Sequence, residues 1–251
     1  MRQRLGGRKG QPSHSPRPSR GRVPLLAGVG SVLLVATPNP DIDAVIFDFA
    51  GVLSSSPGAM MRHQIEASGI DLQVDLLSFM NIIMGPLDEE GDHPWHLLER
   101  GRIGFDEYVA GIEPLWREAG FEGFPTPPRG DDLLSGLSKI PEMIDAAAAV
   151  RAAGYRTAIL TNNIREWGVW RSLWDADNLV DVVIDSCEVG MRKPNADIFE
   201  LTLDRLGSPA ERTLFLDDFP WNIAGAEKVG LQTFHVTDPV AAAAALLDRL
   251  L

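Results

Sequence analysis

Cysteine is almost absent from this sequence. Cys187 is the only one, so no intrachain disulfide bond can form. That excludes a disulfide-stapled secreted scaffold and favours a reducing, cytoplasmic location. Basic residues are also scarce: the chain has 23 Lys and Arg against 35 Asp and Glu. Seven of the basic residues lie in the first 22 positions, which hold no acidic residue. The remainder of the chain therefore has a formal net charge of 16 minus 35, or −19. Because phosphate contacts need clustered Lys and Arg, this excludes nucleic acid as a partner of the body.

A stable membrane span is not expected either. The apolar run Val23–Ala36 has 14 residues, which is too short to cross a bilayer comfortably. It follows a basic stretch and so has the outline of a signal peptide, which would indicate export or membrane tethering. The interpretation we favour is an extension whose apolar part packs on the body or is absent in the cell. Residues 1–22 are rich in Arg, Gly, Ser and Pro, a composition that predicts disorder, so residues 1–40 are assigned as a disordered or processed extension.

From residue 43 onward, short apolar runs alternate with turn residues and helical stretches. Near-continuous apolar runs are typical of strands buried on both faces of a parallel sheet. They occupy residues 44–49, 156–161, 181–186, 213–218 and 232–236. Helices are expected at residues 141–153, 195–206, 221–229 and 239–250. This alternation predicts an α/β fold with a doubly wound, Rossmann-like parallel sheet.

A long insertion separates the first two predicted strands. About a hundred residues lie between them, far more than one crossover helix requires. Helical patterns occur there at residues 59–68, 72–83, 95–100 and 105–119, without a strong strand signal. We therefore assign residues 57–135 to a helical cap and residues 41–56 and 136–251 to the core.

Polar residues follow the predicted strands, and ligands of open parallel sheets bind at the carboxyl ends of strands. In chain order these residues are Asp48, Thr161, Asn162, Lys193, Asp217, Asp218 and Asn222. Three carboxylates, a hydroxyl and a lysine would therefore converge on one rim. Mg²⁺ prefers oxygen ligands and keeps several waters, so two carboxylates and a carbonyl suffice for it. A phosphoryl group needs cation and hydroxyl contacts and an in-line nucleophile, which a carboxylate can supply.

Four segments that carry these residues resemble the motifs of the haloacid dehalogenase superfamily. They are FDFAGVL, ILTNN, GMRKPNADIF and LFLDDFPWNIAGAEKVG, in the family's order and at its spacing over about residues 43–236. Together with the cap segment LERGRIGFDEY, their sequences are similar to those of the phosphatase-like N-terminal domain of soluble epoxide hydrolases and its bacterial relatives. The resemblance implies that Asp48 is the nucleophile. It also implies that Thr161 and Asn162 hold phosphoryl oxygens and that Lys193 steadies the nucleophile and the phosphoryl group.

The same resemblance implies a Mg²⁺ site and exposes one departure. Asp48, the Ala50 backbone carbonyl and Asp218 would bind the metal. Asp217 and Asn222 would lie next to these ligands without binding the metal themselves. Ala50 stands where phosphatases of the family usually carry a second Asp, which protonates the leaving group and later deprotonates the attacking water. Metal binding should survive this change, because Ala keeps its carbonyl. Acid/base catalysis from the side chain is lost, which typically costs about 10²–10⁴ in rate.

Relatives without that Asp include a carbon–phosphorus hydrolase and the dehalogenases. The first needs a cap lysine, and residues 54–138 contain none. The dehalogenases usually carry a different residue set around the nucleophile and in the last motif, where this chain keeps the acidic pair Asp217 and Asp218. Neither alternative is favoured.

The sequence therefore predicts a Mg²⁺-dependent hydrolase that acts on a small phosphorylated molecule, slowly or with good leaving groups only. The alternative is a non-catalytic protein that binds phosphate or a metabolite, or serves as an interaction module, and retains the metal site. The intact nucleophile, lysine and metal ligands favour the enzyme, whereas Ala50 favours the binder. The cap would select the substrate.

Other residues carry weaker signals. The pair His93 and His96 suggests a metal site, but no third ligand is placed, so packing within the cap or surface exposure is favoured. Cys187 is expected to be a small buried hydrophobe. Aromatic residues at helical spacing indicate core or cap packing, and three cap arginines are candidates to meet an anionic substrate. These are Trp167, Trp170 and Trp174, and Arg62, Arg100 and Arg102.

Overall fold

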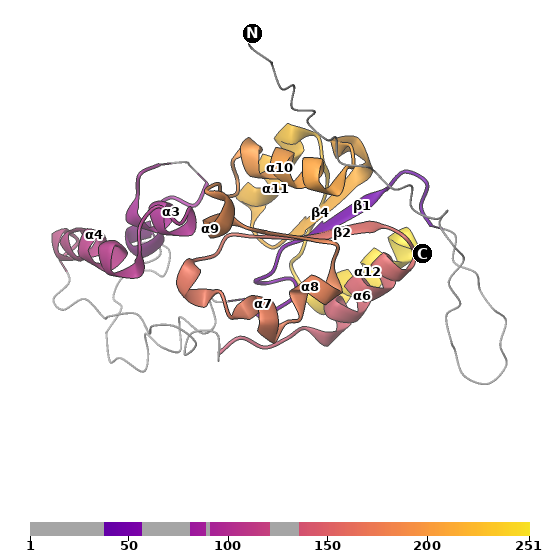
Figure 1. Ribbon diagram of the computed structural model, residues 1–251, viewed down its shortest axis with the longest axis horizontal. Coiled ribbons are helices and arrows are strands. Elements are labelled where there is room, and N and C mark those ends of the chain that lie inside the picture. Colours follow the sequence, from indigo (N-terminus) through magenta and orange to yellow (C-terminus); the bar gives the residue numbers. More distant parts are fainter. Residues whose placement is uncertain (1–37, 57–80, 89–90, 121–135) are drawn as a thin grey trace, which may run out of the picture.

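A five-stranded parallel sheet forms the centre of the computed structural model, which describes residues 38–56, 81–88, 91–120 and 136–251 (Figure 1). Its strands are β1 (Ala44–Phe47), β2 (Arg156–Thr161), β3 (Val182–Asp185), β4 (Thr213–Asp217) and β5 (Gln232–His235). Their order across the sheet is β3-β2-β1-β4-β5. The chain thus winds outward from β1 in one direction and then in the other, which confirms the doubly wound α/β prediction. The reversal of strand order lies between β1 and β4, where such sheets bind ligands.

Helices cover both faces of the sheet (Figure 1). One face carries α6 (Pro141–Ala152), α7 (Trp170–Leu173), α8 (Ala176–Leu179) and α12 (Pro239–Leu250), and the other carries α10 (Ala196–Leu206) and α11 (Pro220–Val229). Val45 and Phe47 pack into the first layer, whereas Ala44 and Ile46 pack into the second, and all four are fully buried. Because every β1 position faces a helix, the strand has no polar face, which is why it reads as a continuous apolar run.

The boundaries of the core helices follow from proline and glycine. Pro141, Pro220 and Pro239 begin α6, α11 and α12, since proline lacks the N–H that a first turn cannot pair. Gly207 and Gly230 end α10 and α11 at positive φ angles of 64° and 93°. The four predicted core helices are confirmed to within one residue at either end. Short elements were not predicted: α7, α8, α9 (Ser186–Val189) and the 3₁₀ turns η1 (Arg165–Trp167) and η2 (Ala210–Arg212).

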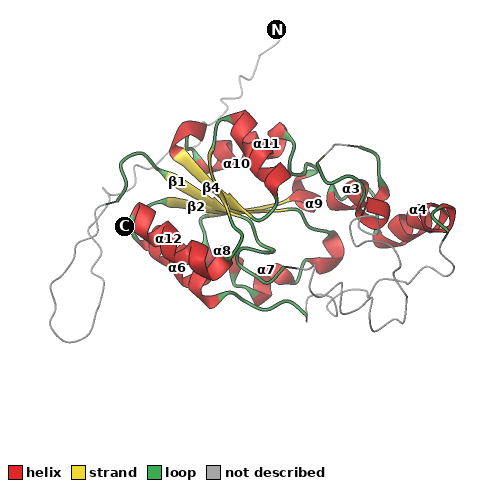
Figure 2. Cartoon of the chain, turned by 180° about the vertical axis from the view of Figure 1, so that it is seen from behind, coloured by secondary structure: helices red, strands yellow, loops and turns green. Residues whose placement is uncertain are grey.

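The insertion between β1 and β2 is helical where it is described. It contains α3 (Pro94–Glu99) and α4 (Phe105–Glu118), which Figure 2 shows at one end of the sheet beyond α9. Trp95, Leu98 and Ile112 form a small core together with Ile164 of the sheet domain. The predicted helices at 95–100 and 105–119 are confirmed, and residues 81–84 are helical too. The predicted helix at 59–68, most of that at 72–83, and the extension up to residue 37 lie outside the described residues.

The two ends of the insertion meet. The Ser55 N–H donates to the Ser138 carbonyl at 2.8 Å, and the Ser138 N–H donates to the Ser55 hydroxyl at 3.0 Å. One step closer to the sheet, the Ile140 N–H donates to the Leu53 carbonyl at 3.1 Å. The insertion is therefore closed by a hydrogen-bonded stem (residues 53–55 and 138–140) on the core. Within the described part of the chain, every helix is too short or too polar to cross a bilayer.

Candidate active site

Asp48 lies directly after β1 in the middle of the sheet. Its N–H donates to the Leu216 carbonyl at 2.9 Å and so continues the pairing of β1 with β4 by one residue. The side chain is almost buried, and its Oδ1 lies 2.8 Å from the Nζ atom of Lys193. Burial raises the pKa of Asp48, and the lysine opposes that shift only in part. The sheet thus presents a carboxylate beside a fixed cation.

Lys193 is almost fully buried and contacts two carboxylates. Its Nζ atom donates to Oδ2 of Asp217 at 2.6 Å, in addition to its contact with Asp48. Burial by itself would lower the pKa of Lys193, but the two carboxylates outweigh burial and raise it. Asn162 fixes the backbone: its Oδ1 accepts from the Lys193 N–H at 2.8 Å and its Nδ2 donates to the Lys193 carbonyl at 2.9 Å. Lys193 therefore stays charged and in place.

Asp217 has its oxygens occupied by donors of the protein. Besides Lys193, the Asn222 amide donates to both oxygens at 3.1 Å, and the Phe219 N–H donates to Oδ1 at 2.8 Å. The side chain is fully buried at the end of β4. This set of donors makes Asp217 an orienting group for Lys193 and for the turn that enters α11.

Asp218, the next residue, is arranged differently. Its Oδ1 atom is buried and has no hydrogen-bond partner among the described residues. Burial, followed by the neighbouring Asp217, raises the pKa of Asp218 to about 7. Gly51 makes its position possible, because a Cβ atom on Gly51 would lie 2.2 Å from Oδ2 of Asp218. Gly51 has a φ of +87°, which glycine adopts without strain. A buried carboxylate oxygen without a protein donor is a candidate ligand for a cation.

The three carboxylates suit a divalent cation. One ligand oxygen from each of Asp48, Asp217 and Asp218 lies within 4.8 Å of the others. Three carboxylates face a single ammonium, and close like charges repel unless a cation lies between them. A hard ion such as Mg²⁺ prefers such oxygen donors. The carbonyl of Ala50 is also spared by its local turn: the hydrogen bonds between residues 49–51 and Ser54 use the Phe49 carbonyl and the Gly51 N–H.

Thr161 ends β2 beside β1. The register pairs Phe47 with Ile159, so Thr161 lies one residue further along the sheet than Asp48. It is buried, and among the described residues its hydroxyl makes one long contact, of 3.4 Å, with the Asn162 carbonyl. The hydroxyl thus retains donor capacity on the rim that also carries Asp48 and Lys193. Asn222, the last of the residues singled out from the sequence, reaches this rim through Asp217.

The weaker sequence signals turn out to be structural. His96 is fully buried in the cap, where burial lowers its pKa to about 4, and His93 caps α3 by accepting from the Trp95 N–H. Cys187 is buried, as expected, and burial raises its thiol pKa. Trp170 and Trp174 pack in the core against Phe49. Partly buried Trp167 packs against both the core and the cap.

Two of the three cap arginines lie in the described part of the chain, and they behave differently. Arg100 binds the Gly91 carbonyl at 2.7 Å within the cap, whereas Arg102 is exposed. Arg62 lies outside the described residues.

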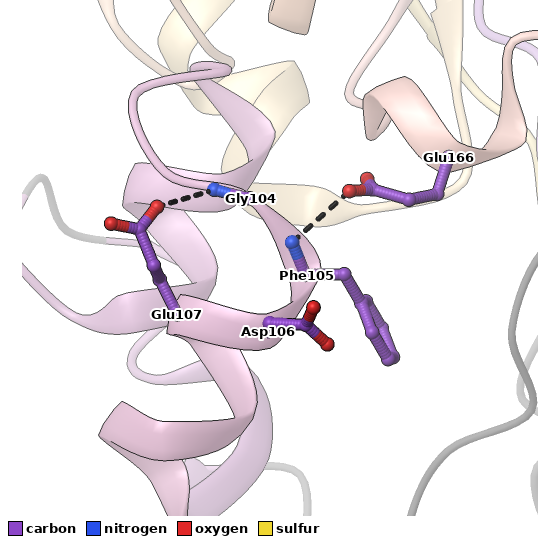
Figure 3. Close-up of a pocket in the computed structure, with 5 residues that line it drawn as sticks. All are labelled: Gly104, Phe105, Asp106, Glu107 and Glu166. Atoms are coloured by element: carbon purple, nitrogen blue, oxygen red, sulfur yellow. Dashed lines mark hydrogen bonds between the residues drawn. The ribbon is translucent and has the colours of Figure 1, made fainter.

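A pocket lies at the start of α4, where the cap meets η1 (Figure 3). Its lining residues are Gly104, Phe105, Asp106, Glu107 and Glu166. Glu166 accepts from the Phe105 N–H at 3.0 Å, and Glu107 accepts from the Gly104 N–H at 2.9 Å. These carboxylates cap the first turn of α4. None of the residues that line the pocket belongs to the carboxylate cluster.

Three residues near the site were not singled out from the sequence. Gly51 could have been suspected from its place three residues after Asp48, but its closeness to Asp218 is a tertiary fact. Arg192 and Glu99 form an ion pair of 2.7 Å that is buried beside the lysine. Both stand in segments quoted for the family resemblance, although nothing in the sequence pairs them.

A Rossmann-like parallel sheet whose central strand is followed by an aspartate, beside a buried lysine and an acidic pair, points to a hydrolase domain with a carboxylate cluster. The chain belongs to the haloacid dehalogenase-like hydrolase family, whose model matches residues 42–230.

Relatives of this chain are named for different activities. Acyl-CoA dehydrogenase family member 10 of Mus musculus is 32% identical over 78% of this chain, and bifunctional epoxide hydrolase 2 of Rattus norvegicus is 29% identical over 78%. This chain covers 18% and 36% of those two proteins. A (S)-2-haloacid dehalogenase of Pseudomonas sp. is 26% identical, over 78% of this chain and 84% of its own. Glyceraldehyde 3-phosphate phosphatase of Methanothermobacter thermautotrophicus is 24% identical, over 78% and 83%.

Solved structures agree on the fold. A haloacid dehalogenase-like hydrolase from Porphyromonas gingivalis is 28% identical, with a TM-score of 0.57, over 83% of this chain and 98% of its own. An enzyme of Bacteroides thetaiotaomicron, described in complex with magnesium and inorganic phosphate, has a TM-score of 0.53 at 19% identity, over 78% and 96%. The second likeness concerns the fold alone.

Proposed function

We propose that this protein is a Mg²⁺-dependent hydrolase of small phosphorylated molecules, with Asp48 as nucleophile. The observation that carries the proposal is the arrangement around Lys193, whose Nζ atom lies 2.8 Å from Asp48 and 2.6 Å from Asp217. One oxygen of Asp48 is thereby held by a cation at the centre of the ligand-binding edge. The relative named as a phosphatase supports phosphorylated molecules as the substrate class. The relative named as a dehalogenase shows that other relatives act on a different class of substrate.

The metal would be held by Asp48, Asp218 and the Ala50 carbonyl. Asp218 supports this choice through its buried Oδ1, which lacks a donor, whereas the oxygens of Asp217 are already occupied. A bound Mg²⁺ supplies positive charge that offsets the repulsion between an anionic nucleophile and an anionic substrate.

The residues of the chain then divide the work of hydrolysis. An Asp48 oxygen attacks phosphorus, the ester oxygen leaves with its electron pair, and an aspartyl phosphate forms, which water then hydrolyses. Lys193 holds Asp48 and neutralises phosphoryl charge, and the Thr161 hydroxyl donates to a phosphoryl oxygen. Asn162 would contribute its main-chain N–H, because its side chain is bound to the Lys193 backbone.

Ala50 limits which esters can react. Its methyl group cannot protonate the leaving oxygen, and it packs partly buried against the core next to Asp48. Esters with acidic leaving groups need no such proton. We therefore place the activity on activated phosphomonoesters, with slow turnover of alkyl phosphates.

Ala50 also favours the second candidate, a protein that binds phosphate or a phosphorylated metabolite without turnover. In that case the carboxylate cluster and Lys193 would serve affinity alone. The two candidates share the metal site and differ only in whether Asp48 reacts.

One experiment separates them: hydrolysis of p-nitrophenyl phosphate with Mg²⁺ by the wild type, Asp48→Asn, and a control, Asp204→Asn, which changes an exposed carboxylate of α10. We expect Mg²⁺-dependent turnover that Asp48→Asn abolishes and Asp204→Asn preserves. Calorimetric binding of inorganic phosphate in Mg²⁺ without any turnover would establish the binder instead. Absence of both turnover and phosphate binding would refute the two candidates together.

A further inference from the structure

We propose that Glu99 of the cap and Arg192 of the core form a positioning pair, through which α3 fixes the loop that carries Lys193. The inference rests on the proposed function for the role of Lys193. It gives the inserted segment a part in positioning that residue.

The pair is buried and joins distant parts of the chain. The Nε atom of Arg192 donates to Oε2 of Glu99 at 2.7 Å, across 93 residues of sequence. The side chains are 1% and 6% exposed. Removing two charges from water costs free energy that their attraction does not always return, so a buried pair is weak evidence of a stabilising role. Conformational specificity is the better account of it, because the residue after Arg192 is Lys193.

Further contacts hold the same end of α3 against the core. The Ser186 hydroxyl donates to the Glu99 carbonyl at 2.7 Å and accepts from the Asn163 N–H at 2.9 Å. Gly101, with a φ of +60°, lies so close to the core that a Cβ atom on it would be 2.4 Å from the Cys187 carbonyl. The end of α3 therefore contacts both ends of the segment 186–192, which precedes Lys193: it contacts α9 at the start of this segment and Arg192 at the end of it.

Small movements of this segment matter for the site. The Lys193 ammonium bridges two carboxylates at 2.8 and 2.6 Å, and only Asn162 otherwise holds its peptide group among the hydrogen bonds described above. Glu99→Gln removes the negative charge that faces the buried Arg192 guanidinium at 2.7 Å, which favours a shift of Arg192 toward water. That movement pulls the adjacent Lys193 away from its partners. Misplacing a catalytic group by about 1 Å can cost about 100-fold in rate.

Glu166 provides a matched control. It is another carboxylate at the cap–core interface, accepting from the Phe105 N–H at 3.0 Å (Figure 3). Glu166→Gln removes a charge from the same cap–core interface, as Glu99→Gln does, but at a site where the partner is a neutral N–H. A general loosening of the cap would follow from both substitutions, whereas displacement of Lys193 would follow from Glu99→Gln alone.

The first test is hydrogen–deuterium exchange of the full chain, followed at residues 191–199. The Lys193 N–H bonds to Asn162 and the Asn195 N–H bonds to the Arg192 carbonyl at 3.1 Å, so both amides report on the segment. Glu99→Gln should raise their exchange rates about tenfold, and Glu166→Gln should leave them near the wild-type rates. Unchanged rates in Glu99→Gln, or equal increases in both variants, would overturn the proposal. This result does not depend on turnover.

The second test uses p-nitrophenyl phosphate with Mg²⁺ and adds the double variant Glu99→Met with Arg192→Met, which replaces the pair by apolar side chains. Glu99→Gln should lower kcat about tenfold to 100-fold with a smaller change in KM. The double variant should recover the wild-type melting temperature but not kcat, since apolar pairs commonly replace buried ion pairs without loss of stability. Recovery of kcat together with stability would make the pair merely structural. An inactive wild type would refute the proposed function, and the exchange experiment would still decide the positioning claim.

Discussion

Gly51→Ala tests the metal site without removing a ligand. The added Cβ atom would lie 2.2 Å from Oδ2 and 2.4 Å from Cγ of Asp218, so the carboxylate must move. Alanine at a φ of +87° also costs about 1–2 kcal/mol of backbone strain. We therefore expect a variant that folds, is less stable, and holds Asp218 away from the cluster.

Gly230→Ala separates the two effects. Gly230 has a φ of +93°, and a Cβ atom there would meet only the Ala210 Cβ at an ordinary 3.7 Å. This variant should lose the same 1–2 kcal/mol or so from strain, or about 2–8 °C in melting temperature for a chain of this size, and retain its response to Mg²⁺. Gly51→Ala should lose as much stability and the metal response as well.

The assay is the melting temperature with and without Mg²⁺. A ligand present at 100 times its Kd stabilises the folded state by about 2.7 kcal/mol, which corresponds to about 5–11 °C here. We expect a shift of that size in the wild type and in Gly230→Ala, and less than about a quarter of it in Gly51→Ala. A full Mg²⁺ shift in Gly51→Ala would refute the assignment of Asp218 as a ligand.

Four further outcomes follow. Asp218→Ala should abolish the Mg²⁺-induced melting shift, and a wild type that shows no shift over a wide Mg²⁺ range would contradict the site. The raised pKa of Asp218, about 7, contributes stability to the metal-free protein that is fully present below about pH 4 and lost as pH rises through about 7. The melting temperature without Mg²⁺ should therefore fall as pH rises over that window, while the Mg²⁺-induced shift grows, because the metal binds the ionised carboxylate. A Mg²⁺-induced shift that does not change with pH would count against this assignment. Ala50→Asp should raise hydrolysis of unactivated phosphomonoesters about tenfold or more and that of activated esters less, whereas equal gains would indicate better folding only. A chain starting at Pro38 keeps the bond from the Asn39 N–H to the Tyr155 hydroxyl and should stay soluble with an unchanged circular dichroism spectrum. If it is insoluble while the full chain is soluble, residues 23–36 pack against the rest of the protein.

The sheet and its core helices could be predicted because their signals are local. Strands buried on both faces read as apolar runs, and Pro141, Pro239 and Gly207 mark helix ends. The shared rim followed from topology alone, since parallel strands direct their carboxyl ends to one edge. The first strand was predicted two residues too long, because β1 ends at Phe47 and the chain bends at Phe49 ahead of Gly51 with its positive φ.

Tertiary contacts were beyond the reach of the sequence. The approach of Gly51 to Asp218 joins residues that are neighbours only because β1 and β4 pair. The helices α7, α8 and α9 have four residues each, too few to show a period. The side chain of Asn162 can both donate and accept, so only its two bonds to the Lys193 backbone reveal which partner it serves.

The hydrogen-bonded stem has an evolutionary consequence. Because Ser55 and Ser138 are hydrogen-bonded, the insertion leaves the core and re-enters it at adjacent positions, as a loop does. Each doubling of such a loop costs only about 0.6 kcal/mol in closure entropy, so a lineage could lengthen or exchange the segment while β1 and β2 stay in register. On the positioning proposal, an exchanged segment would have to place a carboxylate where Glu99 pairs with Arg192 at 2.7 Å.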